Sequence, residues 1–489
     1  MKKVIVIGAG ISGLSAAVYA QRSGFDVTLC EQYSIAGGMC TSWKRNGYLF
    51  EGAVHWLTGS APGTEIYQLW KDTGALGDHV KVFLHDVFHA VENEGKVISL
   101  FRDIEKTVKH LTEISPEDKK LLNRLESDVK AFSNVYMPVY DIKGVKAQNP
   151  KKMNLGLLLK MLPAFPKMGR LRNTSCYEYI RQFKHKGIQR LLNILPGEYS
   201  ATSLIATLST INTGDGGYPE GGSLKMVDRM VQTFTDAGGR LLLNTKVKKI
   251  NIENGSVTGV TLKNEILAAD AVIVTQETTA ACSQLFDKPP DDGWITELCR
   301  NTKPAVCTFI GVGINAEISQ SPVPAWELKE PVTYAGLIVP ELSFYNHSGY
   351  EGYAPKGCTV LTTAFMGDTY DFWKKAKEDG RYDEEKKKLA NQIKSHICQK
   401  YPQAEGNIEV IDIATPLTYE RYTGAYHGSW MSITCAGEKM KMYPQHSNNV
   451  RGLYFAGHRI MTPGGLPVAV FTGRQAAQLV CRQFGAVFK

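Results

Sequence analysis

The first thirty-one residues constrain the fold more than any other part of this chain. A β-branched run at residues 4–7 is typical of a buried strand, and it leads directly into Gly-Ala-Gly-Ile-Ser-Gly at positions 8–13. Residues 14–23 then favour a helix, and a second apolar run at 25–30 favours another strand. Strand, glycine-rich turn, helix and strand in this order predict a βαβ unit of a parallel sheet, and therefore an α/β fold.

The spacing of the three glycines matches the needs of a dinucleotide. Gly8 permits the tight turn, Gly10 allows a pyrophosphate to approach the backbone, and Gly13 allows the helix to pack closely on the strand. Free N–H groups in the first turn of the helix then face the phosphates. Glu31 ends the second strand, where a carboxylate accepts hydrogen bonds from a ribose 2′-OH and disfavours the extra phosphate of NADP. A glycine-rich turn without a ligand is the alternative, and the terminal acid argues against it.

Two segments that follow this unit resemble a known flavoprotein superfamily. Residues 35–42, Ile-Ala-Gly-Gly-Met-Cys-Thr-Ser, resemble the second glycine motif of the FAD-dependent amine-oxidase superfamily. Residues 46–55, Asn-Gly-Tyr-Leu-Phe-Glu-Gly-Ala-Val-His, resemble the next stretch of phytoene desaturases, carotenoid isomerases and retinol saturases. The resemblance implies FAD, because NAD enzymes do not need the second motif. In that family an arginine commonly follows the glycine pair. Met39 stands there in this chain, so a cationic clamp is absent or is supplied by Lys44 or Arg45.

A third resemblance lies near the C-terminus. A strand-like run ends at Gly457, and Thr-Pro-Gly-Gly-Leu-Pro at 462–467 opens a helix at 468–484. The N–H groups of such a helix can stabilise negative charge on a reduced flavin. The segment resembles the family's Gly-Asp…Pro-Gly-Gly motif, with His458 in place of the aspartate that many relatives direct at the ribityl or phosphate groups. The resemblance also implies that the backbone at Val247 meets the adenine ring. The predicted cofactor contacts are Gly8, Gly10, Ile11, Ser12, Gly13, Glu31, Gln32, Gly37, Gly38, Met39, Val247, Gly457, His458, Gly465, Leu466 and Val468.

The motifs divide the chain into three parts. We expect a Rossmann-like FAD-binding domain built from residues 1–60, 211–290 and 446–489, a helical substrate cap at 61–210, and a substrate-binding α+β domain at 291–445. Within the first part, Asn254-Gly255 between two apolar runs predicts a β-hairpin with a type I′ turn.

The resemblance implies an FAD-dependent oxidoreductase that acts on carbon–carbon bonds of an apolar polyene or isoprenoid lipid. A segment at 415–422, Thr-Pro-Leu-Thr-Tyr-Glu-Arg-Tyr, is similar to one in carotenoid isomerases and saturases, so a flavin-dependent cis–trans isomerase is an alternative. An amine oxidase is another, although no aromatic cage can be located in the sequence. Hydride transfer is the work of the cofactor, and the candidate catalytic residues are His55, which follows a flavin-bordering motif, Tyr422 and His427. Because a second dinucleotide motif is absent, electrons must come from or pass to an external partner or the substrate.

Charge and cysteine content bear on the partners. The net charge is +8, and residues 143–172 hold eight basic residues and no acid, interspersed with leucine and methionine. This pattern predicts a peripheral contact with anionic lipid, and a solvated face of the cap is the alternative. Nucleic acid is disfavoured because no recognition motif accompanies the charge. Ten cysteines without a CxxC pair predict reduced thiols, no metal and a cytoplasmic protein. No apolar run reaches the ~18 residues that cross a bilayer.

Overall fold

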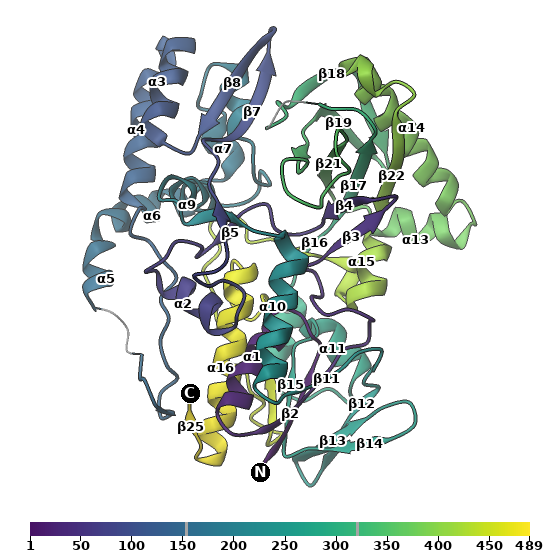
Figure 1. Cartoon of the computed structure of the whole chain (residues 1–489). Helices are drawn as coiled ribbons and strands as arrows, with labels where there is room; N and C mark the ends of the chain where they lie inside the picture. The colour runs from purple at the N-terminus through teal and green to yellow at the C-terminus, as the bar shows by residue number, and fades with distance from the viewer. Residues whose placement is uncertain (152–154, 319–321) are drawn as a thin grey trace.

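The computed structural model describes residues 1–151, 155–318 and 322–489. Its centre is a five-stranded parallel sheet with the strand order β11-β2-β1-β15-β24, in the lower half of Figure 1. The strands are Arg240–Leu242 (β11), Asp26–Cys30 (β2), Lys3–Ile7 (β1), Ala271–Val274 (β15) and Leu453–Phe455 (β24). Helix α1 (Ile11–Arg22) joins β1 to the parallel strand β2, so the predicted βαβ unit and α/β fold class are confirmed.

Two helices from distant parts of the sequence pack together beside this sheet. α1 contacts α16 (Leu466–Phe484), the yellow helix next to it in Figure 1. The Ser15 hydroxyl donates to the Val470 carbonyl oxygen at 2.7 Å. A Cβ on Gly473 would lie 2.3 Å from the Ser12 carbonyl oxygen, so glycine at this position permits the close approach of the two backbones.

A helix and a β-meander also belong to this half. Helix α10 (Gly222–Asp236) precedes strand β11, and the meander consists of β12 (Lys249–Glu253), β13 (Ser256–Thr261) and β14 (Ile266–Ala268). Asn254 and Gly255 connect β12 to β13 with φ values of 48° and 72°. A type I′ turn requires positive φ at both central residues, so the predicted hairpin is confirmed.

A four-stranded antiparallel sheet, with the order β20-β21-β17-β22, occupies the upper right of Figure 1. Its apolar face packs against α14, where Leu389, Ile393 and Ile397 are fully buried. The elements are β17 (Cys307–Ile314), β18 (Trp326–Tyr334), β19 (Leu337–Leu342), β20 (Tyr345–Asn346), β21 (Thr359–Met366), α13 (Tyr370–Glu378), α14 (Tyr382–Lys400) and β22 (Ile408–Ala414).

The region at 61–210 was predicted to be helical, but it also contains an antiparallel hairpin of β7 (Val87–Asn93) and β8 (Lys96–Phe101). Ile98 and Leu100 of β8 share one apolar cluster with the cap helices. Polar side chains on β7 and an exposed Val97 obscure the alternation that signals a strand. The helices are α2 (Glu65–Asp72), α3 (Ile104–Ile114), α4 (Lys119–Ala131), α5 (Leu155–Lys160), α6 (Phe165–Arg172), α7 (Cys176–Ile180), α8 (Lys186–Leu192) and α9 (Ala201–Asn212).

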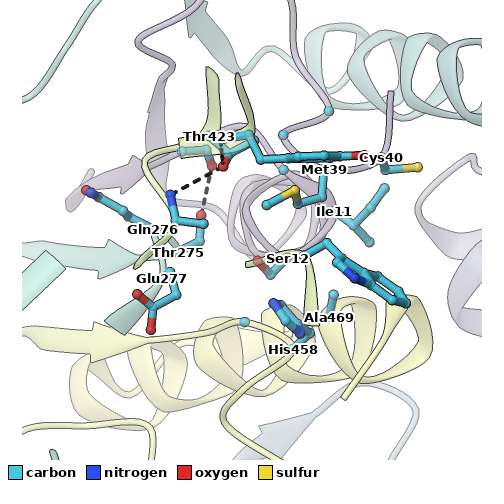
Figure 2. Close-up of a pocket in the computed structure, with 18 of the residues that line it drawn as sticks. Ile11, Ser12, Met39, Cys40, Thr275, Gln276, Glu277, Thr423, His458 and Ala469 are labelled. Carbon is cyan, nitrogen blue, oxygen red and sulfur yellow. Dashed lines mark hydrogen bonds between the residues drawn. The ribbon is translucent and has the colours of Figure 1, made fainter. Parts of the chain in front are cut away.

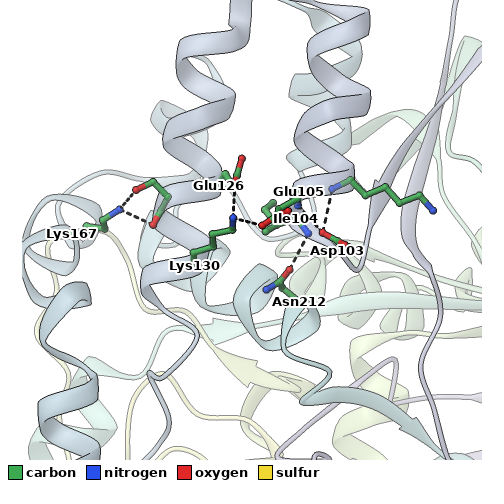
Figure 3. Close-up of polar contacts among 9 residues, drawn as sticks. Asp103, Ile104, Glu105, Glu126, Lys130, Lys167 and Asn212 are labelled. Carbon is green, nitrogen blue, oxygen red and sulfur yellow. Dashed lines mark hydrogen bonds and ion pairs between the residues drawn. The ribbon is translucent and has the colours of Figure 1, made fainter.

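Polar contacts hold the cap helices together, as Figure 3 shows. The Asp103 carboxylate caps the N-terminus of α3, and the side-chain oxygen of Asn212 on α9 accepts from the Ile104 N–H at 2.9 Å. Lys130 on α4 pairs with Glu126 and with Glu105 of α3. The domain boundaries at 61–210 and 291–445 stay a prediction. The shorter remaining elements are β3 (Ser42–Arg45), β4 (Tyr48–Glu51), β5 (Leu57–Thr58), β6 (Val82–Phe83), β9 (Lys146–Ala147), β10 (Gly216–Pro219), α11 (Thr278–Gln284), α12 (Gly293–Asn301), β16 (Pro304–Ala305), α15 (Pro416–Thr423), β23 (Met431–Ser432) and β25 (Val487–Phe488).

Candidate cofactor and active site

A long cavity opens at the carboxyl ends of the parallel strands, which is where open α/β sheets bind their ligands. Its wall includes Gly8 after β1, Glu31 after β2, Thr275 after β15 and Ala456 after β24. About 1790 Å³ of this space is free of protein atoms, part of it open to solvent. Figure 2 labels wall residues from α1, from the 39–40 segment, from the 275–277 segment and from the start of α16, with His458 below them.

Glycines keep the cavity open. A Cβ on Gly10 would meet only the carbonyl oxygen of Gly37, at 3.8 Å, and a Cβ on Gly457 would meet no protein atom within 4 Å. Gly37 and Gly38 have positive φ values of 124° and 58°, which glycine tolerates best. Residues from the first turns of α1 and α16 also line the wall. Two helix N-termini and a glycine cradle fit a ligand that carries phosphates and a ring that becomes negatively charged.

Glu31 is almost fully buried, and its carboxylate is held by the backbone. Oε2 accepts from the Ala9 N–H at 2.8 Å, and Oε1 accepts from the Tyr33 N–H at 2.9 Å. Burial raises the pKa of Glu31, and the N–H groups that it accepts oppose this rise. Each oxygen keeps a second lone pair, so the carboxylate can still accept from a ribose hydroxyl.

The cavity wall gathers most of the predicted cofactor residues. Gly13 and Val468 are the exceptions, since both are buried behind the wall. A Cβ on Gly13 would lie 1.9 Å from the Gly8 carbonyl oxygen, in keeping with its predicted role in helix–strand packing. The contacts of these residues with a cofactor stay a prediction. The predicted residues on the wall are Gly8, Gly10, Ile11, Ser12, Glu31, Gln32, Gly37, Gly38, Met39, Val247, Gly457, His458, Gly465 and Leu466.

His55 lies on the cavity wall, with its ring stacked on Tyr345 at a centroid distance of 4.2 Å and an interplanar angle of 9°. Its Nδ1 is buried and has no hydrogen-bond partner among the described residues. Burial lowers the pKa of His55 to about 4, so the imidazole is neutral near pH 7.

The other two catalytic candidates occupy different places. Tyr422 lies on the wall, in edge-to-face contact with Tyr33 at 4.7 Å, and its hydroxyl accepts from Arg421 at 2.6 Å. His427 is not on this wall. It lies parallel to Tyr370, with ring centroids 4.2 Å apart, so the structure favours a packing role for it.

A buried carboxylate fixes the turn that carries His55. Glu51 is fully buried, and its Oε1 accepts from two N–H groups of the following turn, at 3.1 and 3.2 Å. Oε2 accepts from the Ser223 N–H at 3.0 Å and from the Tyr218 hydroxyl at 3.1 Å. Tyr353, which precedes the second sheet's strand β21, also donates to it, at 3.3 Å. Glu51 therefore joins three distant segments beside the cavity.

Sequence reasoning missed several residues of the wall. The positions just after β15 and at the start of β17 adjoin apolar runs of the sequence that signal strands, but the 429–431 segment has no local pattern. The structure places neither Lys44 nor Arg45 on the wall, and Arg45 instead lies 3.3 Å from the Asp412 carboxylate. The missed residues are Thr275, Gln276, Glu277, Cys307, Phe309, Ala364, Tyr419, Ser429, Trp430, Met431 and Arg459.

The fold and the cavity define a dinucleotide-binding α/β enzyme with a second, antiparallel sheet beside its cofactor site. The family pattern described as flavin containing amine oxidoreductase matches residues 11–481, and the chain belongs to this family. It is an FAD-dependent oxidoreductase, and the resemblance and the cofactor predicted from the sequence are confirmed.

Individual relatives are distant but span the chain. A 1-hydroxycarotenoid 3,4-desaturase from a Flavobacterium species is 23% identical and aligns over 98% of this chain and 99% of its own length. The chloroplastic prolycopene isomerase of Daucus carota is 22% identical over 98% of this chain and 80% of its own. The solved structure of cyclohexylamine oxidase from Brevibacterium oxydans superposes with a TM-score of 0.60 at 15% identity, covering 99% of both chains. That last likeness shows the fold alone.

Proposed function

We propose that this oxidoreductase acts on carbon–carbon bonds of an apolar polyene or isoprenoid lipid, as a desaturase or a saturase. The observation that carries the proposal is the apolar and aromatic character of the wall away from the glycine motifs. Apolar surface gains roughly 25 cal/mol per Å² on burial, so such a wall favours a hydrocarbon chain. The full-length similarity to a carotenoid desaturase supports the same substrate class. The residues of this part of the wall are Cys307, Phe309, Ala364, Tyr419, Trp430 and Met431.

The residues around His55 suit chemistry on an uncharged substrate. FAD supplies the hydride acceptor or donor when it is bound. The neutral imidazole of His55 can donate or accept one hydrogen bond beside the substrate, and its stacking on Tyr345 fixes the plane of the ring. Apolar side chains of the same wall, such as Phe309, help to exclude water from the reacting carbon atoms. This part of the wall thus offers a polyene apolar contacts and one neutral imidazole.

A flavin-dependent cis–trans isomerase is the second candidate, supported by the similarity to prolycopene isomerase. The same apolar wall suits isomerisation, which needs no net transfer of hydrogen. An amine oxidase is less well supported. Among the described wall residues the acids are Glu31 and Glu277, and each already has partners, the first in backbone N–H groups and the second in Arg459. Neither is a free counter-ion for a substrate ammonium group.

Product mass distinguishes these reactions. FAD-loaded protein is incubated with a polyene, with the flavin either oxidised or chemically reduced. A product that has lost or gained two hydrogens supports the proposal, whereas unchanged mass with changed retention supports the isomerase. Rapid flavin reduction by simple amines, with no response to polyenes, would overturn both. Ala364→Trp fills the cavity and should abolish polyene turnover while FAD stays bound, and Ala364→Ser is the control of similar size.

The cap presents an apolar face that suits contact with a membrane surface. Leu155, Leu159, Leu162 and Phe165 on α5, α6 and the turn between them are 70%, 61%, 53% and 45% exposed. Exposed cations next to this face favour anionic headgroups. Within the described residues, no helix is long and apolar enough to cross a bilayer.

The charge of this face is smaller than the sequence predicted. Lys167 and Arg170 pair with the buried Asp128 at 3.2 and 2.5 Å, so they are not free for lipid. Lys152 and Met153 lie outside the described residues. Lys160 and Arg172 remain exposed beside the leucines.

Vesicle flotation tests the membrane contact. Wild-type protein should float with vesicles that contain anionic lipid, and less so at high salt. Leu159→Ser combined with Phe165→Ser should abolish flotation. Ile338→Ser is the matched control, because Ile338 is 71% exposed on β19, away from this face. If the double variant floats like wild type, the face is only a solvated part of the cap.

A further inference from the structure

A buried arginine lies on the wall of the cofactor cavity, where no sequence motif predicted one. Arg459 follows His458 after β24 and is 6% exposed. Its Nη2 donates to the Ser429 hydroxyl, and its Nη1 lies 3.0 Å from Oε1 of Glu277. Nε has no hydrogen-bond partner among the described residues, and Nη1 has only its ion pair with Glu277.

Glu277 cannot satisfy this guanidinium by itself. Its carboxylate caps α11 by accepting from the Thr279 and Ala280 N–H groups, at 3.0 and 2.9 Å. It also accepts from the Tyr426 N–H at 3.3 Å. Burial lowers the pKa of Arg459, but an arginine side chain stays protonated in proteins. A buried cation with unused donors, on the wall of a ligand cavity, calls for an acceptor supplied by the ligand.

The charges on the wall identify that acceptor. The pyrophosphate of FAD carries two negative charges, and the oxidised flavin ring carries none. Among the wall residues that the structure describes, Lys246 and Arg459 are the cations, and Lys246 is exposed in the segment that follows β11. Met39 stands after the glycine pair, and Arg45 is paired with Asp412 and is not among the residues of this wall. A guanidinium is also the side chain best matched to phosphate oxygens.

We propose that Arg459 binds the pyrophosphate of FAD and replaces the positive charge that is missing at position 39. The guanidinium then shares its donors between Glu277, Ser429 and a phosphate oxygen. The N-terminus of α1 supplies backbone donors to the same group. In this arrangement Arg459 acts on cofactor affinity and not on the chemical step.

Cofactor affinity tests the proposal, because riboflavin has the flavin ring of FAD but no phosphate. Apoprotein is titrated with FAD and with riboflavin, and binding is followed by quenching of flavin fluorescence. Arg459→Met should lower the ratio of FAD affinity to riboflavin affinity at least tenfold. Arg459→Lys, which keeps the charge but loses the fork of donors, should lower it less. Arg181→Met, at an exposed residue of the cap that lies outside the cavity wall, is the control and should leave both affinities unchanged.

A second variant separates phosphate binding from support of the fold. Glu277→Gln removes the competing carboxylate charge and keeps the guanidinium, so FAD affinity should be equal to or higher than that of wild type. If Glu277→Gln weakens FAD as much as Arg459→Met does, the pair only holds the fold and the proposal is wrong. Equal losses of FAD and riboflavin affinity in Arg459→Met, or no loss of either, would overturn it as well. Should Arg459→Met fail to fold, the ratio measured for Arg459→Lys and the result for Glu277→Gln decide the question.

Discussion

Gly10 and Gly13 have different roles in the glycine-rich segment after β1: Gly10 leaves space for the pyrophosphate, and Gly13 allows α1 to pack on the strand. Replacing each with alanine tests the two roles separately. The added methyl group is the same, but it meets different surroundings. On Gly13 it would lie 1.9 Å from the Gly8 carbonyl oxygen and 2.9 Å from the Thr275 hydroxyl oxygen. On Gly10 it would meet only the Gly37 carbonyl oxygen, at 3.8 Å. The backbone of Gly10, with φ −74° and ψ 179°, also suits alanine.

The magnitudes follow from these distances. Carbon–oxygen contacts relax at about 3.3 Å, so Gly13→Ala has to open roughly 1.4 Å between α1 and the turn after β1. Overpacking of this kind costs about 1–3 kcal/mol of unfolding free energy. Gly10→Ala should leave the unfolding free energy of the apoprotein within about 0.5 kcal/mol. Its methyl group instead occupies space that the phosphates need, and a 100-fold loss of FAD affinity, about 2.7 kcal/mol, is expected.

Urea unfolding of the apoproteins and titration with FAD measure both effects. Gly169→Ala is the control, because a Cβ there meets no atom within 4 Å and the residue lies on α6, outside the cavity wall. The opposite pattern would refute the assignment of roles: a lower unfolding free energy in Gly10→Ala, and a lower FAD affinity without a loss of unfolding free energy in Gly13→Ala. So would wild-type FAD affinity in Gly10→Ala.

Three further predictions concern buried ionisable groups. His55→Ala should lower turnover about 100-fold with the flavin spectrum and Tm nearly unchanged, and because the pKa of His55 is about 4, the wild-type kcat should show no inflection from it between about pH 5.5 and 8. If the variant keeps the wild-type turnover, His55 has only a packing role. Burial raises the pKa of Asp215 from 3.8 to about 6, so the folded protein holds this proton more tightly than the unfolded chain does. The unfolding free energy therefore falls by up to about 3 kcal/mol as the pH rises from 3.8 to about 6. Urea unfolding of Asp215→Asn at several pH values should show a smaller fall over this range. An equal fall in the variant and the wild type would contradict this account. Glu51→Ala should lower the unfolding free energy by about 3 kcal/mol or more, because it leaves several buried donors unpaired; the exposed Glu117→Ala should change it by less than about 0.5 kcal/mol, and equal effects would argue against the buried network.

The features that the sequence predicted are local in the chain. The turn after β1 and the Asn254-Gly255 hairpin each depend on a few adjacent residues, so the local sequence pattern was enough to predict them. The hairpin of β7 and β8 was missed, although Glu94 and Gly95 at its turn both have positive φ. A Glu-Gly pair is a weaker turn signal than Asn-Gly or Asp-Gly.

The rest of the site depends on tertiary contacts. Arg459 contacts Ser429 and Glu277, which are 30 and 182 positions away in the sequence. A local sequence pattern cannot predict contacts over such separations. The pKa of His55 depends on burial beneath distant segments such as the strand of Tyr345. A motif could place His55 near the flavin, but it could not assign its protonation state.

Because α1 packs against α16, the FAD-binding domain cannot finish folding until nearly the whole chain has been synthesised. The hydrogen bond from Ser15 to Val470 joins residues 455 positions apart. At 5–20 residues per second, a ribosome needs roughly 20–90 s to pass from one to the other. During that time the apolar face of α1 lacks its partner helix, and the cavity lacks the wall formed by Gly457 and Gly465. We therefore expect FAD to be captured only after α16 has left the ribosome, and the emerging N-terminal unit to depend on chaperones until then.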